Sequence, residues 1–248
     1  MRFGVPNPAM ARLPGLAELL SPHSLVLGRR ACRRDRQLEA LLAWGRKPSA
    51  AWAEAEARRR ELPLWRCEDG FLRSLGLGPE DPPLALVLDD RGIYYDATAP
   101  SRLDRLVAAP LSDGERQRAR GLRQAWCDAR LSKYNGARES PPPDDDFVLV
   151  VDQTAGDLSL RWGAGDAEAF AAALAAALAD HPRHRVVVKQ HPDVVAGRKR
   201  GHFSPAQLRH DRIITMADGG HPVALLERAT AVYVVTSQMG FERSEEHT

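Results

Sequence analysis

Polar residues follow three apolar runs in the second half of the chain, at the point where each run ends. The three clusters are Asp152-Gln153-Thr154-Ala155-Gly156-Asp157-Leu158-Ser159, Lys189-Gln190-His191-Pro192-Asp193 and Thr236-Ser237-Gln238. Together they supply carboxylates, a cation, an imidazole and hydroxyls, which are groups suited to a charged, oxygen-rich ligand. Their shared placement after apolar runs favours a binding or catalytic site over three unrelated loops.

Each cluster also has a plain structural interpretation. Lys189 directly follows three valines, and a lysine there can neutralise a phosphate as a point charge. His191 can donate to a phosphate oxygen or shuttle a proton, although a His-Pro pair is usually a loop. Backbone N–H groups near Thr236 and Ser237 can bind an anion, although such residues often only cap a helix. Asp and Gly after a strand are often only turn residues.

The first half of the chain holds one comparable motif. It is the segment Arg66-Cys67-Glu68-Asp69-Gly70-Phe71-Leu72-Arg73-Ser74, in which two acids are flanked by arginines. The structural interpretation is a helix cap with a surface ion pair, which contributes little stability. The functional interpretation is a general acid/base carboxylate that faces Asp157 across a cleft between two domains. Glycosyl transfer with retention needs one carboxylate that attacks the anomeric carbon and a second group that handles protons.

A basic run, Arg198-Lys199-Arg200-Gly201, remains open between two interpretations. It is either a solvated loop or a contact for a sugar carboxylate or an acceptor. The sequence alone does not favour one over the other.

The hydrophobic pattern predicts the strands and helices that must position these polar clusters. Residues 147–151, 186–188, 213–214 and 232–235 are predicted strands, and residues 167–179 and 222–228 are predicted helices. The alternation of strands and helices predicts a parallel, Rossmann-like sheet. Ligands bind such sheets outside the carboxyl ends of the strands, which is where the polar clusters lie.

The first half is less regular. We expect an irregular segment 1–47 with one strand at 24–27, helical periodicity over 33–43, and a helix from Pro48 to about Arg60. A strand is expected at 62–67, and two more at 84–88 and 93–95 around the hairpin turn 89–92. Residues 103–130 read as one or two helices, and 141–146 as a linker.

Composition narrows the class of protein. The 248 residues carry a formal net charge of +2, which gives no overall field for nucleic acid, and aromatic residues do not interleave with a basic stripe. No apolar run reaches the roughly 18 residues of a membrane span, and the N-terminal segment lacks the pattern of a signal peptide. Three scattered cysteines argue against a disulfide framework or a paired-cysteine zinc site and fit a reducing cytoplasm.

The motifs together resemble the KpsC/LipB family of capsule polysaccharide proteins, whose members are transferases of Kdo, an acidic eight-carbon sugar. The resembling segments cover about residues 40 to 242: Trp44-Gly45-Arg46-Lys47-Pro48-Ser49, Glu68 to Gly78, Gly92-Ile93-Tyr94-Tyr95-Asp96-Ala97-Thr98, Leu131-Ser132-Lys133-Tyr134-Asn135, Val151 to Thr154 with Gly156-Asp157, Lys189 to Asp193, and Val234 to Glu242.

The resemblance implies a retaining β-Kdo glycosyltransferase that uses CMP-Kdo as donor and a Kdo-primed glycolipid at the inner face of the cytoplasmic membrane as acceptor. It implies Asp157 as the nucleophile and Glu68 as the general acid/base. For the CMP phosphate and nucleotide the resemblance implies Lys189, His191, Thr236 and Ser237, with Gln153 and Pro192 in the same clusters. For the Kdo carboxylate it implies Arg73 and Lys133. It implies no metal and no cofactor, since basic groups can offset the phosphate charge.

The fold that the resemblance implies is α/β and GT-B-like, with two Rossmann-like domains. We expect an acceptor-side domain at 1–140, a linker at 141–146, and a nucleotide-sugar-binding domain at 147–242. The tail 243–248, RSEEHT, looks like a translated sequencing adapter, so we expect the second domain to be incomplete and the fragment to be inactive if it lacks part of the pocket. Gln190 departs from the Val or Ile usual in the family. Two alternatives stay open, a non-catalytic capsule assembly scaffold and a transferase for another nucleotide sugar.

Overall fold

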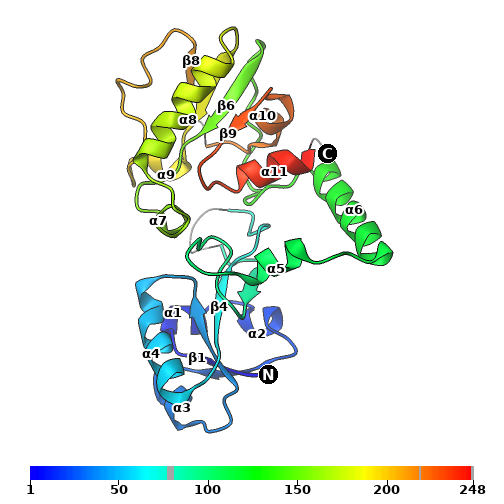
Figure 1. Ribbon diagram of the computed structural model, residues 1–248, viewed down its shortest axis with the longest axis vertical. Coiled ribbons are helices and arrows are strands. Elements are labelled where there is room, and N and C mark those ends of the chain that lie inside the picture. The colour runs from blue at the N-terminus through cyan, green and yellow to red at the C-terminus, as the bar shows by residue number, and fades with distance from the viewer. Residues whose placement is uncertain (77–80, 218, 247–248) are drawn as a thin grey trace. The chain divides into compact units, whose positions relative to one another are not determined.

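The computed structural model describes residues 1–76, 81–217 and 219–246. Two compact units divide the chain, unit 1 from Met1 to Pro110 and unit 2 from Leu111 to the C-terminus. Each unit is built around its own β-sheet (Figure 1). The segment 141–146, expected as the linker between domains, lies inside unit 2 by this division. Leu77 and Gly78 of the first-half motif lie outside the described residues.

Unit 1 contains a five-stranded sheet in the order β2-β1-β3-β4-β5. Four strands are parallel and β5 runs antiparallel to β4. The strands are β1 Arg2–Val5, β2 Ser24–Leu27, β3 Ala40–Trp44, β4 Leu64–Asp69 and β5 Leu86–Asp89. The helices are α1 Pro8–Ala11, α2 Leu16–Leu19, α3 Arg29–Arg34, α4 Ala51–Arg60 behind a 3₁₀ turn Pro48–Ala50, and α5 Arg102–Ala108.

Three expectations for unit 1 are wrong. The segment 1–47 is not irregular, because β1 and β3 lie in it, and the helical periodicity over 33–43 spans the end of α3 and most of β3. Four of the five β3 residues are buried in the middle of the sheet, so a short apolar run is a strand here. Residues 93–95 form no strand, because Asp89 Oδ1 accepts the N–H groups of Arg91 and Gly92 and turns the chain away from β5. The predicted helix from Pro48 to Arg60 and the strand β4 are confirmed.

Unit 2 contains a four-stranded parallel sheet in the order β8-β7-β6-β9, which confirms the predicted parallel sheet. The strands are β6 Phe147–Val151, β7 Arg185–Lys189, β8 Ile213–Met216 and β9 Val232–Tyr233, the last shorter than predicted. The helices are α6 Asp113–Asp128, α7 Leu158–Trp162, α8 Ala167–Asp180, α9 Pro192–Val195, α10 Val223–Arg228 and α11 Met239–Glu246.

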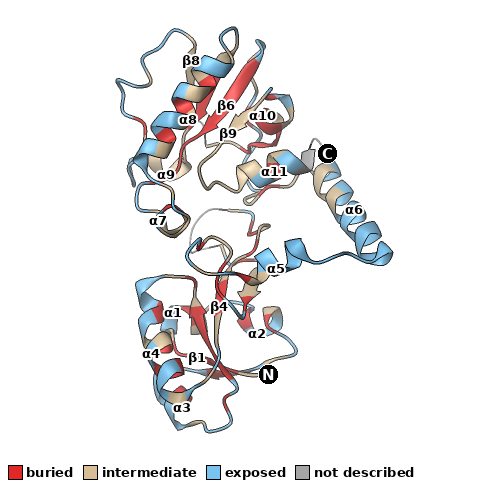
Figure 2. Ribbon diagram, viewed as in Figure 1, coloured by how far each residue is buried: buried red, intermediate tan, exposed pale blue. Residues whose placement is uncertain are grey.

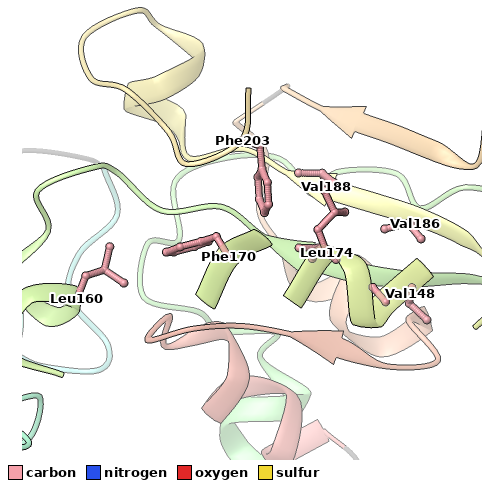
Figure 3. Close-up of a cluster of buried hydrophobic side chains, with 9 residues drawn as sticks. Val148, Leu160, Phe170, Leu174, Val186, Val188 and Phe203 are labelled. Atoms are coloured by element: carbon pink, nitrogen blue, oxygen red, sulfur yellow. The ribbon is translucent and has the colours of Figure 1, made fainter. Parts of the chain in front are cut away.

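Both faces of the unit 2 sheet are covered, which explains its continuous apolar strands. Alternate residues of β6 point to opposite faces. Val148 and Val150 pack with Phe170 and Leu174 of α8, whereas the other residues of β6 pack with Leu225 and Leu226 of α10. Figure 3 shows the first of these clusters, and Figure 2 shows β6 as buried along its length.

Two further observations bear on function. No helix in the described part of the chain is long and apolar enough to cross a membrane. Cys32 and Cys67 are free thiols buried in unit 1, and burial raises the pKa of both, to about 11 for Cys32. Cys67 lies in β4, next to Glu68.

Candidate active site

The strand ends of β6 and β9 meet through Gln153 and Thr236. The Gln153 side-chain amide donates to Thr236 Oγ1 at 2.9 Å, and the Thr236 backbone N–H donates to Gln153 Oε1 at 3.1 Å. A third group joins them, since Ser159 Oγ lies 3.0 Å from Thr236 Oγ1. Two of the three polar clusters therefore converge as the parallel topology predicts.

Asp157 lies at the start of α7, where its carboxylate caps the helix by accepting the Ser159 N–H at 3.0 Å. The turn before it needs Gly156, whose φ is +85°. Because Ser159 also contacts Thr236, the half-buried carboxylate of Asp157 is held close to the Gln153–Thr236 pair. The candidate nucleophile thus has a fixed backbone position beside the converged strand ends.

The third strand end, that of β7, carries Lys189 and His191. Lys189 is only 7% exposed, and its ammonium donates to Ser140 Oγ at 3.2 Å. His191 caps α9, with its Nδ1 accepting the Asp193 N–H at 3.1 Å and Pro192 in the first turn. Burial lowers the pKa of His191, against the opposing charges of Asp193, Asp157 and Asp152. A neutral imidazole that accepts at Nδ1 carries its proton on Nε2, where it can donate to a ligand.

Ser237 follows β9 and uses its hydroxyl to accept the Met239 N–H at 3.3 Å, so it also caps the turn into α11. The capping interpretation considered for Ser237 is therefore realised, and Asp157 and His191, interpreted from sequence as turn and loop residues, cap helices as well. Capping fixes these side chains at the strand ends and leaves their remaining polar atoms for a ligand role.

Asp152 belongs to this edge but was not singled out by sequence reasoning as a site residue. It is 2% exposed, and its Oδ1 accepts the N–H groups of Gln153 and His202 at 2.9 and 3.0 Å. Its buried Oδ2 has no hydrogen-bond partner among the residues that the structure describes, and burial raises the pKa of the carboxyl. Its position directly after an apolar strand was the signal, but that signal does not separate it from an ordinary turn residue.

In unit 1, Glu68 lies at the end of β4 between two aromatic donors. Trp44 Nε1 donates to Oε1 at 2.6 Å, and the Tyr95 hydroxyl donates to Oε2 at 3.2 Å. Burial raises the pKa of Glu68, with the Lys47 charge opposing this shift. A carboxyl group with a raised pKa can hold or take a proton near neutral pH, as a general acid/base requires.

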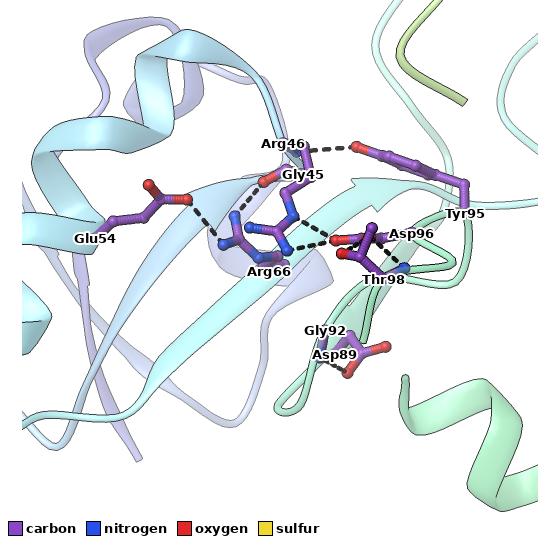
Figure 4. A network of polar contacts seen from close by, with 9 residues as sticks. All are labelled: Gly45, Arg46, Glu54, Arg66, Asp89, Gly92, Tyr95, Asp96 and Thr98. Atoms are coloured by element: carbon purple, nitrogen blue, oxygen red, sulfur yellow. Dashed lines mark hydrogen bonds and ion pairs between the residues drawn. The ribbon is translucent and has the colours of Figure 1, made fainter. Parts of the chain in front are cut away.

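The loop that carries Tyr95 is held by the Arg46–Asp96 ion pair. Arg46 pairs with the Asp96 carboxylate at 2.5 Å and uses its backbone N–H to donate to the Tyr95 hydroxyl at 2.9 Å (Figure 4). Arg66 donates to the Gly45 carbonyl and to Glu54. Neither aromatic donor to Glu68 was recognised from sequence as a functional residue, although both lie in resemblance motifs.

Two sequence-predicted candidates for a sugar carboxylate are engaged within the protein. Arg73 is 8% exposed and donates to Asp69 at 3.0 Å and to Ser74 at 2.7 Å. Lys133 places its ammonium 5.7 Å from the centre of the Tyr134 ring, and its backbone N–H donates to Glu242. Glu242 is 3% exposed and ties this loop to α11, and burial raises its pKa.

The structure thus joins the clusters after β6 and β9 directly and places Lys189 beside Ser140. The pairing of Asp157 with Glu68 stays a prediction, because these residues lie in different units. No group of three or more His, Cys, Asp or Glu side chains that could hold a metal ion was found among residues 1–76, 81–217 and 219–246.

Similarity to known proteins is extensive. The family model for capsule polysaccharide biosynthesis proteins matches residues 39–135 and 117–246. Over 248 aligned residues the chain is 37% identical to the capsule polysaccharide modification protein LipA of Neisseria meningitidis serogroup B, covering 96% of this chain and 34% of LipA. It is 33% identical to the lipopolysaccharide-processing protein LpsZ of Rhizobium meliloti, covering 82% of this chain and 48% of LpsZ. The chain therefore spans about a third to a half of these relatives.

Two solved structures are similar over 99% of this chain. The Thermosulfurimonas dismutans KpsC β-Kdo 2,4 transferase matches with a TM-score of 0.86 and 37% identity, with 77% of that chain covered. The β-Kdo 2,7 transferase of KpsC from the same organism matches with a TM-score of 0.65 and 23% identity, with 76% of that chain covered. The second match shows a shared fold only.

Proposed function

Because the chain belongs to the capsule polysaccharide biosynthesis protein family, we propose that it is a retaining β-Kdo glycosyltransferase module that uses CMP-Kdo as donor. The observation that carries the proposal is the similarity to the KpsC β-Kdo 2,4 transferase, with 37% identity and a TM-score of 0.86 over 99% of this chain. The polar edge of the unit 2 sheet and the half-buried carboxyl of Glu68, whose pKa is raised, support it from the residues upward.

The proposed architecture is GT-B-like, with the donor bound between two Rossmann-like domains. The two sheets, one in each unit, are consistent with it, since the unit 2 sheet is parallel and the unit 1 sheet is parallel except for β5. In this arrangement the carboxyl ends of β6, β7 and β9 form the nucleotide side of the site. Glu68 is then supplied by the acceptor side.

The proposed mechanism is a double displacement. In the first step an Asp157 oxygen attacks the anomeric carbon of Kdo, and the bond to the CMP phosphate breaks with its electron pair leaving on the phosphate. In the second step Glu68 takes the proton of the acceptor hydroxyl, whose oxygen attacks the anomeric carbon and releases the Asp157 carboxylate. Two inversions give retention of configuration.

Binding roles follow from the charge and position of the strand-end groups. Lys189 and the Nε2–H of His191 are proposed to hold the phosphate of CMP, with Thr236, Ser237, Gln153 and Pro192 lining the nucleotide. Arg73 and Lys133 are proposed for the sugar carboxylate, although their present contacts compete with that role. Because cationic groups can offset the phosphate charge, the proposal includes no metal and no other cofactor.

The proposed acceptor is a Kdo-primed glycolipid, met at the inner face of the cytoplasmic membrane by a cytoplasmic protein in peripheral contact with it. For the linkage we favour β-2,4, since the 2,4 transferase shares 37% identity with this chain and the 2,7 transferase 23%. The linkage is tested by NMR of the product made from a single Kdo acceptor.

The deciding experiment offers the purified chain CMP-Kdo, CMP-sialic acid and UDP-sugars in separate reactions with a Kdo-terminated acceptor. Transfer from CMP-Kdo alone is expected, and the Asp157→Asn variant is expected to lose it by several orders of magnitude while still binding CMP. Asp166→Asn is the matched control, because Asp166 caps α8 as Asp157 caps α7.

Other results would replace the proposal. Transfer from a different nucleotide sugar would make the chain a transferase of another class. Turnover by Asp157→Asn equal to that of Asp166→Asn would remove the mechanism. Absence of transfer and of CMP binding in the folded wild-type chain would favour a capsule assembly scaffold.

A further inference from the structure

The run Arg198-Lys199-Arg200, here called the basic loop, is anchored beside the strand ends of unit 2. At its start, the backbone N–H groups of Arg198 and Lys199 donate to the Asp193 carbonyl at 2.9 and 3.0 Å. At its end, the Arg200 carbonyl accepts the Ala155 N–H at 2.8 Å. The basic loop is therefore tied to the two strand-end segments that carry His191 and Asp157.

The residues that follow the basic loop fix its stem in the core. The His202 N–H donates to Asp152 Oδ1 at 3.0 Å, and the His202 ring stacks on Phe170 with centroids 4.0 Å apart. Gly201 lies so close to Asp152 that an added Cβ would collide with its Oδ2. Phe203 is buried in the hydrophobic cluster of Figure 3. The three basic residues are themselves exposed, and these contacts fix the position of the loop beside the strand ends, which the functional interpretation of the run requires.

The three cations of the basic loop differ in their partners. Arg198 and Lys199 both pair with the Asp193 carboxylate, at 2.7 and 3.6 Å. Arg200 is exposed and, among the residues that the structure describes, pairs with no carboxylate. The loop thus presents the guanidinium of Arg200 without a carboxylate partner among the described residues. The Arg200 backbone is held in place because its carbonyl accepts the N–H of Ala155, two residues before Asp157.

We propose that Arg200 binds the carboxylate of a sugar acid at this edge of unit 2, as a specificity-determining residue. A guanidinium binds a carboxylate through two parallel N–H···O bonds, which gives geometric as well as charge selectivity. The inference rests on the proposed function, in which the donor sugar and the terminal acceptor sugar both carry a carboxylate. Asp193 and Asp152 act as positioning residues that hold the loop.

The test compares the Arg200→Gln variant with the wild-type chain in steady-state transfer. Loss of a charged hydrogen bond is expected to raise one KM by about 10- to 100-fold. A change in the KM of CMP-Kdo assigns the donor carboxylate, and a change in the KM of the Kdo-terminated acceptor assigns the acceptor carboxylate. Inhibition by CMP, which has a phosphate but no carboxylate, is expected to stay unchanged.

A second arm removes the carboxylate charge from the ligand. The wild-type chain is expected to have a lower KM for the substrate with a free carboxylate, whether donor or acceptor, than for the methyl ester of that substrate. The Arg200→Gln variant is expected to lose most of this difference in KM. Arg183→Gln is the matched control, because Arg183 is an exposed arginine just before β7, at the opposite end of that strand, and its loss changes the net charge equally.

Calorimetric binding of free Kdo and CMP-Kdo separates this inference from the proposed function. If the wild-type chain transfers no Kdo but binds it, and the Arg200→Gln variant binds it more weakly, the proposed function would be wrong and the inference about Arg200 would hold. Equal KM values, equal ester discrimination and equal Kdo binding in Arg200→Gln and Arg183→Gln would overturn the inference. Weaker CMP inhibition in Arg200→Gln would also overturn it, since Arg200 would then serve the phosphate.

Discussion

In unit 1 the candidate acid/base Glu68 lies between Trp44 and Tyr95, and burial raises its pKa. In unit 2 the candidate groups come from three strand ends and are held mainly by backbone caps and by the Gln153–Thr236 pair. The first arrangement shifts the pKa of one carboxyl group, whereas the second places several hydrogen-bond donors and charges where an anion can bind. Under the proposed function, unit 1 handles protons and unit 2 binds the ligand, and this division can be tested.

The largest expected effect is on proton handling. Glu68→Gln keeps the acceptor oxygen for Trp44 but cannot exchange a proton, so kcat is expected to fall about 100- to 10,000-fold with little change in the KM of CMP-Kdo. Steady-state transfer assays measure both constants. Glu54→Gln, at a carboxylate that pairs with Arg66 in the same unit, is the control. A Glu68→Gln variant with an unchanged kcat and a raised KM of CMP-Kdo would show that Glu68 serves donor binding and not proton transfer.

Gly45→Ala tests how tightly unit 1 encloses its carboxyl. Gly45 has a φ of +41°, and an added Cβ would meet the Tyr95 hydroxyl and lie 2.6 Å from Glu68 Oε2. The free energy of unfolding is expected to fall by about 2–4 kcal/mol, as measured by urea denaturation. Gly121→Ala in α6 is the control and should be neutral or stabilising, because the added Cβ would meet no described residue outside the surrounding helical turn within 4 Å. Equal stability of the two variants would mean that the enclosure is loose.

Thr236→Val tests the contact between strand ends in unit 2. It removes the hydroxyl that bonds Gln153 and Ser159, and the nearly buried Gln153 amide loses a partner. The free energy of unfolding is expected to fall by about 1–2 kcal/mol, with weaker inhibition by CMP and an unchanged pH profile. Thr215→Val, at an exposed position of β8, is the control. A changed pH profile in Thr236→Val would link unit 2 to proton handling.

The smallest effect concerns stability and pH. The folded-state pKa of Glu68 is raised above its ordinary value near 4.5, so its contribution to stability is fully present at lower pH and is lost as pH rises through the folded-state value. The wild-type free energy of unfolding, relative to Glu68→Gln, is therefore expected to decrease as pH rises from about 4.5 and then to level off. Parallel curves for the two proteins across this range would show that Glu68 is not enclosed.

Sequence patterns predicted unit 2 well because its strands are buried on both faces. The run at 147–151 and the valines of β7 leave no competing interpretation, and the parallel order follows from the intervening helices. Unit 1 was harder, because β3 is a short apolar run that follows a charged helix and its burial depends on β1 and β4. Local periodicity does not contain that tertiary information.

The same limit applies to the site. Glu68 was recognisable as an acid after a strand, but its environment depends on the register of β3 against β4, which pairs Trp44 with Cys67. Tyr95 reaches Glu68 from a loop held by the Arg46–Asp96 ion pair, far along the chain. The sequence places Asp152 in a polar cluster but does not single it out, because its anchoring of the basic loop depends on His202, fifty residues later. Residue type was predictable, whereas the partners that set its chemistry were not.

Cys67 gives the strand that carries Glu68 a built-in reporter. Its thiol is fully buried in β4, and burial keeps it protonated, so an alkylating reagent can reach it only when this strand separates from its neighbours. The rate of labelling at this one sulfur therefore measures how often the enclosure around the adjacent carboxyl opens. A ligand that slows this labelling would show, without any turnover, that its binding stabilises the strand that carries Glu68.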